Sequence, residues 1–169
     1  MSAGQMPIGE ITAREYINSN GQMADKKAVV KYDAKNKTTY IYFEDVNGDY
    51  AIVLNVKTKN EFLTLCKKFF EIADGQTGDD NKKQARLGVI TTSLYFDYAE
   101  KWYMSKPDVP VFLNFLPQQG SVYDLAISFG RAVSMKNKSI QYSPSDRYIA
   151  ETELRHLVEM FSAEDGQKN

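Results

Sequence analysis

The stretch of sequence that decides the fold is residues 28–56, which read AVVKYDAKNKTTYIYFEDVNGDYAIVLNV. Apolar and polar side chains alternate along three runs of this stretch, and a period of two is typical of half-buried β-strands. Turn-forming residues at 34–37 and 46–49 separate the runs. The second turn contains Asn47-Gly48, a dipeptide that favours a hairpin because both residues tolerate positive φ. The sequence therefore predicts three antiparallel strands.

An amphipathic helix is expected directly after these strands, over residues 59–73. Its apolar side chains recur every three or four residues and form one stripe, which consists of Phe62, Leu65, Cys66, Phe69, Ile72 and Ala73. Thr58 and Glu61 match a capping box at its start, and Gly75 is placed to end it. A solvated linker is expected over residues 75–85, because this stretch is rich in glycine and charge.

Alternation with a period of two returns in the second half of the chain. The strands expected there cover residues 90–98, 101–104, 111–116, 121–135 and 139–142. Residues 121–135 also fit a helical period in part, but small or polar side chains at nearly every second position favour a strand with a bend at Gly130. A last helix over residues 152–161 repeats the spacing of the first apolar stripe with Leu154, Leu157, Val158 and Phe161.

These elements predict an α+β fold in which antiparallel β-sheets pack against two helices. Both halves have the order β-meander then helix, which indicates a tandem arrangement; the alternative is an α+β protein whose halves share this order by chance. A length of 169 residues fits one domain, 28–162. A short helix is expected at 12–18, where Thr12 and Glu15 match a capping box. We expect an N-terminal arm over 1–27 and a polar tail over 163–169. Between them, the domain consists of a first half over 28–74, a linker over 75–85 and a second half over 86–162.

The composition argues against several kinds of active site. Lys and Arg number 21 against 22 Asp and Glu, and the resulting net charge of -1 argues against a uniformly basic nucleic-acid coat. The one cysteine, Cys66, cannot form an intramolecular disulfide. The one histidine, His156, has no nucleophile beside it in the sequence. We therefore expect a non-enzymatic protein that uses no metal and no cofactor.

The N-terminal sequence indicates a protein that stays inside the cell. Residues 1–7 lack the basic and apolar regions of a secretory signal. No window approaches the roughly 18 consecutive apolar residues that a membrane span needs. A lone cysteine also suits a reducing compartment. We expect a cytoplasmic location and no membrane association.

Aromatic and basic residues on strand faces are the remaining functional signal. The chain has 11 Tyr, 9 Phe and 1 Trp, and several Tyr alternate with the apolar residues of their strand. Single-stranded nucleic acid is bound by such surfaces, because bases stack on aromatic rings and Lys or Arg contacts the phosphates. The candidate nucleic-acid-binding residues are Lys27, Lys31, Lys37, Tyr40, Tyr42, Tyr95, Lys101, Trp102 and Arg131.

A protein–protein interaction module is the alternative function. Tyr is also common in strands simply because it packs well. Asp33, Glu44, Asp45 and Asp97 are interspersed with the candidate residues and would weaken a phosphate track. On this hypothesis the strand aromatics are interface hot spots of a regulator, inhibitor or assembly subunit. The sequence leaves open the partner and the choice between DNA and RNA.

The organisation of residues 26–161 resembles the Whirly-type single-stranded-DNA-binding fold and the related Pur-type modules. Lys26-Lys27-Ala28-Val29-Val30 is similar to the basic and then small apolar motif of an early Whirly strand. The first half has three predicted strands where the family has four. The resemblance implies binding through sheet faces, assembly into a homo-oligomer and no catalysis. It assigns binding first to Lys27, then to Lys31 and Tyr40.

Overall fold

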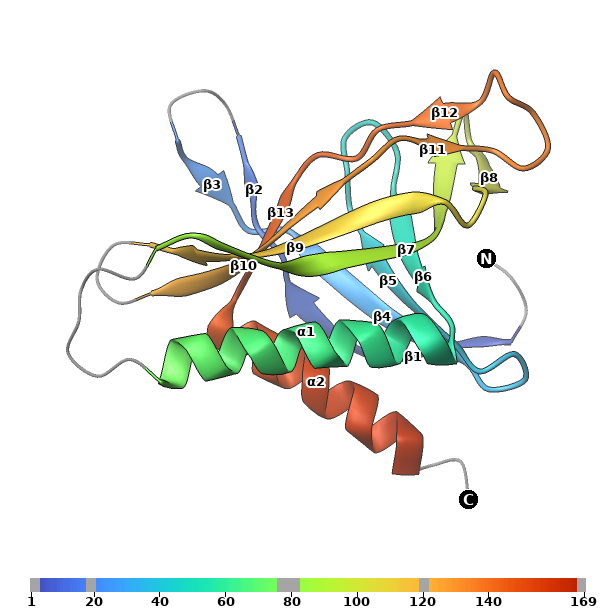
Figure 1. Cartoon of the computed structure of the whole chain (residues 1–169). Helices are drawn as coiled ribbons and strands as arrows, with labels where there is room; N and C mark the ends of the chain where they lie inside the picture. Colours follow the sequence, from blue (N-terminus) through green and yellow to red (C-terminus); the bar gives the residue numbers. More distant parts are fainter. Residues whose placement is uncertain (1–3, 18–20, 76–82, 119–121, 167–169) are drawn as a thin grey trace.

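The computed structural model describes residues 4–17, 21–75, 83–118 and 122–166 (Figure 1). The helices among these residues are α1 (Val56–Asp74) and α2 (Glu151–Gly166). The strands are β1 (Gln5–Thr12), β2 (Glu15–Tyr16), β3 (Met23–Ala24), β4 (Lys27–Asp33), β5 (Thr38–Phe43), β6 (Tyr50–Leu54), β7 (Ala85–Tyr98), β8 (Lys101–Met104), β9 (Val109–Pro117), β10 (Tyr123–Phe129), β11 (Ala132–Val133), β12 (Gln141–Tyr142) and β13 (Arg147–Ala150). The fold is α+β with antiparallel strands, as predicted.

A nine-stranded antiparallel sheet forms the frame of the molecule. Its order is β1-β4-β5-β6-β7-β9-β10-β13, and β8 pairs with β7 beside this path. The long strand β7 joins the two halves, because its residues 93–96 pair with β6 while its residues 85–92 pair with β9. The two predicted meanders therefore share a strand and belong to one sheet.

The three strands predicted from residues 28–56 are confirmed as β4, β5 and β6. Their register places Val30, Ile41 and Ile52 side by side, so the apolar residues of the three strands share one face. The turn between β5 and β6 contains Gly48 at a φ of 114°, a conformation that disfavours side chains. A Cβ at this glycine would also collide with the backbone oxygen of Asp97. Glycine is therefore required where the turn meets β7.

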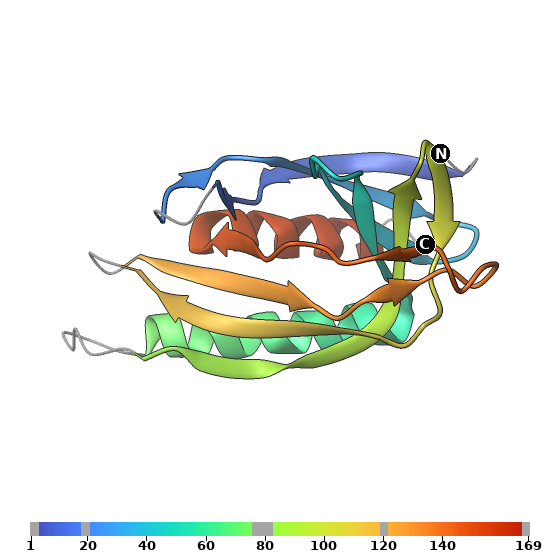
Figure 2. The same cartoon turned by 90° about the horizontal axis from the view of Figure 1, so that it is seen from above.

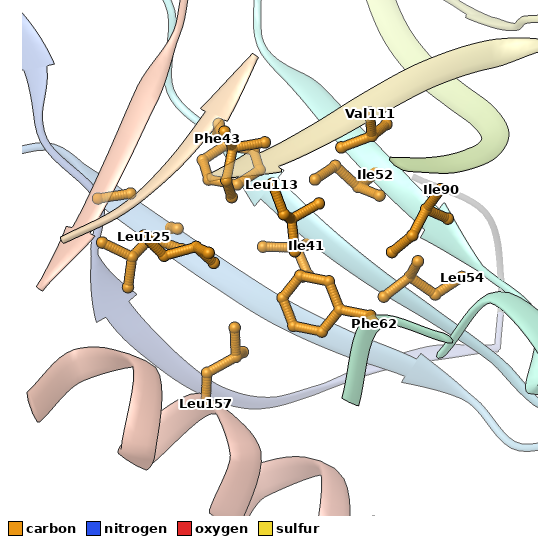
Figure 3. Packing of buried hydrophobic residues seen from close by; sticks show 14 of the residues in the cluster. Ile41, Phe43, Ile52, Leu54, Phe62, Ile90, Val111, Leu113, Leu125 and Leu157 are labelled. Atoms are coloured by element: carbon orange, nitrogen blue, oxygen red, sulfur yellow. The ribbon is translucent and has the colours of Figure 1, made fainter. Parts of the chain in front are cut away.

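The hydrophobic core lies between the inner face of the sheet and the two helices. α1 packs on β6 and β7, and the rings of Phe62 from α1 and Phe161 from α2 lie 5.8 Å apart. Figure 3 shows core side chains from the sheet and both helices converging, among them Ile41, Ile52, Phe62, Leu113, Leu125 and Leu157. Burying each such side chain contributes roughly 1.5–3 kcal/mol, so this shared core holds the two halves together.

α2 lies between the two ends of the sheet. It contacts β1 at one end and β10 and β13 at the other, and Figure 2 shows it running between them. The two ends also meet directly: the Arg14 and Tyr148 backbones exchange N–H···O hydrogen bonds of 2.8 and 2.9 Å. Both edges of the sheet are thereby partly covered, which limits edge-to-edge pairing with other chains.

The N-terminal stretch differs from the predicted arm. Gln5–Thr12 forms β1, which pairs with β4 as part of the main sheet, and Glu15–Tyr16 is the short strand β2. The expected helix at 12–18 is therefore wrong. Ile11 and Ala13 are both buried, and side chains two residues apart share a face in a strand but not in a helix. Tertiary pairing overrides the local capping signal.

The boundaries of both helices differ from prediction. The N-cap of α1 is Asn55, whose side chain accepts from the Thr58 backbone N–H at 2.9 Å, so the capping box starts three residues before the predicted one. Gly75 ends α1 as predicted, although its φ of -78° is an ordinary right-handed conformation. α2 continues to Gly166, so the first residues of the predicted tail 163–169 are helical.

The predictions for residues 75–85 and 121–135 have mixed outcomes. Residues 76–82 of the expected linker lie outside the described residues, and β7 begins at Ala85. Residues 123–129 form a strand as predicted, and β11 follows after a break at Gly130. A Cβ at Gly130 would lie only 2.6 Å from Cγ of Pro110, so the chain turns where a side chain has no room.

Candidate functional site

Four aromatic rings lie together on the outer face of the sheet, opposite the core. They are Tyr40 and Tyr42 from β5, Tyr95 from β7 and Trp102 from β8, here called the aromatic tetrad. The ring centroids form a closed circuit with separations of 6.0 Å for Tyr40–Tyr42, 5.7 Å for Tyr42–Trp102, 4.9 Å for Trp102–Tyr95 and 6.4 Å for Tyr95–Tyr40. Tyr40 is buried and the other three are half-buried. All four were candidate residues from sequence.

A small side chain on β6 allows the tetrad to form. Tyr42, Ala51 and Tyr95 are direct cross-strand neighbours on β5, β6 and β7. Ala51 is fully buried although it faces away from the core. Because alanine has only a methyl group, rings from β5 can reach over β6 and contact rings from β7 and β8. No local sequence signal identifies Ala51, because its role depends on the register of β5, β6 and β7.

Lys31 adds a positive charge to the tetrad. Its Nζ lies 4.9 Å from the centroid of the Tyr42 ring, within the range of a cation–π interaction. The Tyr42 hydroxyl donates a 2.5 Å hydrogen bond to Gln5 Oε1. Burial raises the pKa of Tyr42 to about 12 and also raises the pKa values of Tyr40 and Tyr95. The phenols therefore stay neutral at physiological pH and offer uncharged rings.

A cavity of about 740 Å³ adjoins the tetrad. It lies where β8 meets the segment after β11, which is held in place by a 3.0 Å hydrogen bond from Met135 N–H to the Met104 carbonyl. Its lining residues are Tyr95, Lys101, Trp102, Tyr103, Met104, Met135 and Lys136. Sequence analysis proposed Tyr95, Lys101 and Trp102 for binding. It missed the others as site residues, because no local pattern links residues 135–136 to β8.

The remaining candidate residues lie apart from the tetrad circuit. Lys27 is on the outer face of β4, where its Nζ is 3.5 Å from the Glu10 carboxylate. Lys37 is exposed in the turn between β4 and β5 and has a φ of 52°. Arg131 is exposed between β10 and β11, and its Nη1 donates to Gln141 Oε1 at 3.4 Å. Lys31 contacts the aromatic face directly, whereas Lys101 pairs with Tyr98 on the opposite face of β8 from Trp102 and lines the adjoining cavity.

Acidic residues near the tetrad have structural roles. Asp33 accepts hydrogen bonds from the Asn36 side chain at 2.8 Å and from the Lys35 and Asn36 backbone N–H groups, and these bonds hold its pKa below the ordinary value. Glu44 accepts from the Lys27 backbone at 3.3 Å. Asp97 is the cross-strand partner of Trp102, so its side chain lies on the same face of the sheet as the tetrad. These hydrogen bonds leave the carboxylates charged, so they oppose a phosphate track as the sequence indicates.

Asp45 belongs to a separate, interior cluster around Arg147. The Arg147 side chain is 0% exposed, and its Nη2 lies 3.3 Å from Glu15, 3.7 Å from Asp45 and 2.6 Å from the Glu44 carbonyl. The Tyr142 hydroxyl lies 2.9 Å from Asp45 Oδ2, and its pKa is raised chiefly by burial. This Arg147 cluster ties β13 and β2 to the β5–β6 turn, which is a structural role.

The cysteine and the histidine of the chain lie away from the aromatic tetrad. Cys66 is buried on the core-facing side of α1, and burial raises the pKa of its thiol, which suppresses reactivity. His156 is exposed on α2. Within the described ranges, no three His, Cys, Asp or Glu side chains are placed to hold a metal ion. None of the described helices is long and apolar enough to cross a bilayer.

Comparison with known proteins gives no relative for this chain: no protein-family model, no curated protein and no solved structure matches it.

Proposed function

We propose that this protein is a non-enzymatic binder of single-stranded nucleic acid and that the aromatic tetrad is its binding surface. The observation that carries the proposal is the closed circuit of four neutral rings from three strands, with the Lys31 ammonium 4.9 Å from one of them. Such a surface combines stacking partners with a charge for phosphate. Similarity to Whirly-type and Pur-type modules, and assembly into a homo-oligomer in the cytoplasm, remain part of this proposal.

The physical basis is the tolerance of stacking for any base. Every base has a π-face, and stacking on an aromatic ring contributes roughly 1–3 kcal/mol per base. The net charge of -1 requires that the electrostatic attraction is local to the binding face. Lys31 on β4 supplies that local charge beside the tetrad, and Lys101 on β8 supplies a second charge at the adjoining cavity.

Fluorescence polarisation with labelled single-stranded DNA and RNA of about ten nucleotides tests the proposal, since OB-fold domains that bind single strands cover roughly 4–16 nucleotides. We expect binding that weakens with salt. Loss of one stacking ring in Tyr42→Ala weakens binding by about tenfold. Lys31→Ala lowers the salt slope by about 1.

A matched control is present on the outer face of β7 and β9. There, the Arg86 guanidinium lies 4.9 Å from the Phe112 ring, so a cation again sits over an aromatic ring but outside the tetrad. Arg86→Ala and Phe112→Ala should leave binding unchanged. Absence of binding at low salt, or equal losses in the two pairs of variants, contradicts the proposal.

The alternative function, a protein–protein interaction module, is favoured by Asp97 beside Trp102. A carboxylate next to an aromatic anchor is unfavourable for phosphate but common at polar interface rims. On this alternative the tetrad is the centre of a protein interface, and Tyr42→Ala abolishes association in light scattering after size exclusion while oligonucleotides do not bind.

A further inference from the structure

We propose that the cavity between β8 and residues 135–136 is a subsite for one nucleoside monophosphate unit, with the base among the rings and thioethers and the phosphate at the two lysines. This inference rests on the proposed function and deepens it. The unit can belong to a bound strand or be a free nucleotide, because the recognised chemistry is the same.

The lining matches a planar aromatic group. Tyr95, Trp102 and Tyr103 contribute rings, and Met104 and Met135 contribute thioethers, which pack well against aromatic faces. The volume of about 740 Å³ falls within the range of small-molecule sites. The walls therefore suit a base that has left the stack of its neighbours.

The charges of the cavity select an anion. Lys101 and Lys136 both line it and are both exposed, so the cavity carries two solvent-accessible positive charges. A cage for a methylated ammonium group also uses aromatic rings, but two lysines repel such a cation. An aromatic ligand with a phosphate satisfies the rings and the lysines together.

The cavity is continuous with the tetrad. Tyr95 and Trp102 belong to both, and their ring centroids are 4.9 Å apart. A strand stacked on the tetrad can therefore place its next base in the cavity without leaving the aromatic surface.

The wall opposite β8 is preformed. Besides the Met135–Met104 hydrogen bond, the Lys106 backbone N–H donates to the Val133 carbonyl at 3.1 Å. The backbones of Ser105 and Ser134 also form an isolated antiparallel β-bridge. Met135 is nevertheless 62% exposed, which an occupant would reduce. A wall that is ordered in advance lowers the entropy lost on binding.

Trp102 is the only tryptophan of the chain, so its fluorescence reports on this cavity directly. We expect adenosine 5′-monophosphate to quench Trp102 in a saturable manner. Adenosine should bind more weakly, and inorganic phosphate should not quench. Lys136→Ala should weaken binding of the monophosphate by about fivefold, which is the effect of one exposed charge contact. The same variant should bind adenosine with unchanged affinity.

Lys138→Ala is the matched control, because Lys138 is exposed in the same connection between β11 and β12 but does not line the cavity. Equal losses for Lys136→Ala and Lys138→Ala would overturn the subsite, since the effect would then be nonspecific charge. Circular dichroism checks that each variant is folded.

The two proposals fail in different ways. In one outcome, oligonucleotides bind and Tyr42→Ala weakens their binding, but the monophosphate does not quench Trp102 fluorescence and Lys136→Ala has no effect. The subsite is then wrong and the proposed function stands. If the monophosphate binds with the expected dependence on Lys136 while oligonucleotides do not bind, the subsite stands and the proposed function is wrong.

Discussion

Two aromatic clusters lie on opposite faces of the sheet around β5 and β7, and their surroundings differ. The inner cluster consists of Phe43, Tyr50, Phe96 and Tyr142, with ring centroids of 5.2 Å for Phe43–Tyr50 and 5.5 Å for both Tyr50–Tyr142 and Phe96–Tyr142. The outer cluster is the aromatic tetrad. Both have similar ring separations, so packing distance alone does not distinguish a core from a binding surface.

The difference lies in what surrounds the rings. Inner rings are buried beneath the sheet, and the Tyr142 hydroxyl lies 2.6 Å from the Gly48 carbonyl in a fixed network. Outer rings contact mainly one another, and three of the four remain half-exposed. A cation accompanies each cluster: buried Arg147 lies 5.9 Å from the Phe43 and Tyr50 rings, and Lys31 lies above Tyr42. Inner aromatics thus stabilise the fold, whereas outer aromatics are available to a ligand.

The largest expected effect is a difference in stability between alanine variants of the adjacent residues Phe96 and Tyr95. Phe96→Ala opens a cavity in the inner cluster and should lower the free energy of unfolding by about 3–5 kcal/mol. Tyr95→Ala removes a half-exposed ring from the tetrad and should lower the free energy of unfolding by less than half of that amount. Urea unfolding of both variants measures this difference. Equal destabilisation would mean that the tetrad is a second core rather than a surface.

The two cations provide the next test. Arg147→Ala leaves the carboxylates of Glu15 and Asp45 without their buried partner, which should destabilise the protein by about 3 kcal/mol. Lys31→Ala removes an interaction at the surface and should change stability by about 1 kcal/mol or less. Thermal unfolding compares them. A smaller loss for Arg147→Ala than for Lys31→Ala contradicts the assignment of the inner cluster to stability.

Ala51 tests whether the tetrad depends on the space above β6. Ala51→Leu forces extra methyl groups beneath the rings, and overpacking of this kind costs about 1–3 kcal/mol. It should also separate the rings of β5 from those of β7 and β8 and thereby weaken oligonucleotide binding. Val29→Leu, on the outer face of β4 next to Tyr42, is the control and should have a smaller effect on both. Unchanged binding in Ala51→Leu contradicts the role of Ala51.

The smallest effect concerns the turn between β4 and β5, at the edge of the outer face. Because the Asn36 hydrogen bond lowers the pKa of Asp33, the folded state favours the ionised carboxylate. This contribution is present above the unfolded pKa of about 3.9 and is lost as the pH falls through the lower, folded pKa. Asn36→Ala should therefore lower stability at about pH 7, and its effect should become smaller as the pH falls toward about 2.

Urea unfolding at the two pH values measures the Asn36 effect, and the Asp33→Asn background is its control. In that background, Asn36→Ala should no longer show a pH-dependent loss. A loss that is equal at both pH values indicates that Asn36 acts through the turn conformation and not through the Asp33 carboxylate.

Much of the fold and part of the site were predictable from local patterns. Alternation from Ala28 to Leu54 identified three strands and which face of each carries Tyr, because side chains alternate strictly along a strand. The apolar stripe of Phe62, Leu65 and Phe69 identified α1 for a similar reason. The same alternation identifies the four rings of the tetrad as candidate binding residues.

The remaining features depend on contacts between distant residues. The pairing of Gln5–Thr12 with β4, the sharing of β7 by both halves and the joining of Met135 to Met104 have no periodic signature in any one segment. Burial of Arg147 is a further case, since arginine is ordinarily a surface residue.

Sequence by itself determined the strands β4, β5 and β6, the helix α1 and the apolar faces of these elements, because their patterns repeat within a few residues of chain. Only the tertiary structure decided that four rings form a circuit over Ala51, that a cavity adjoins them and that the N-terminal stretch enters the sheet. These features depend on strand register and on packing across the sheet, where side chains far apart in the chain come into contact.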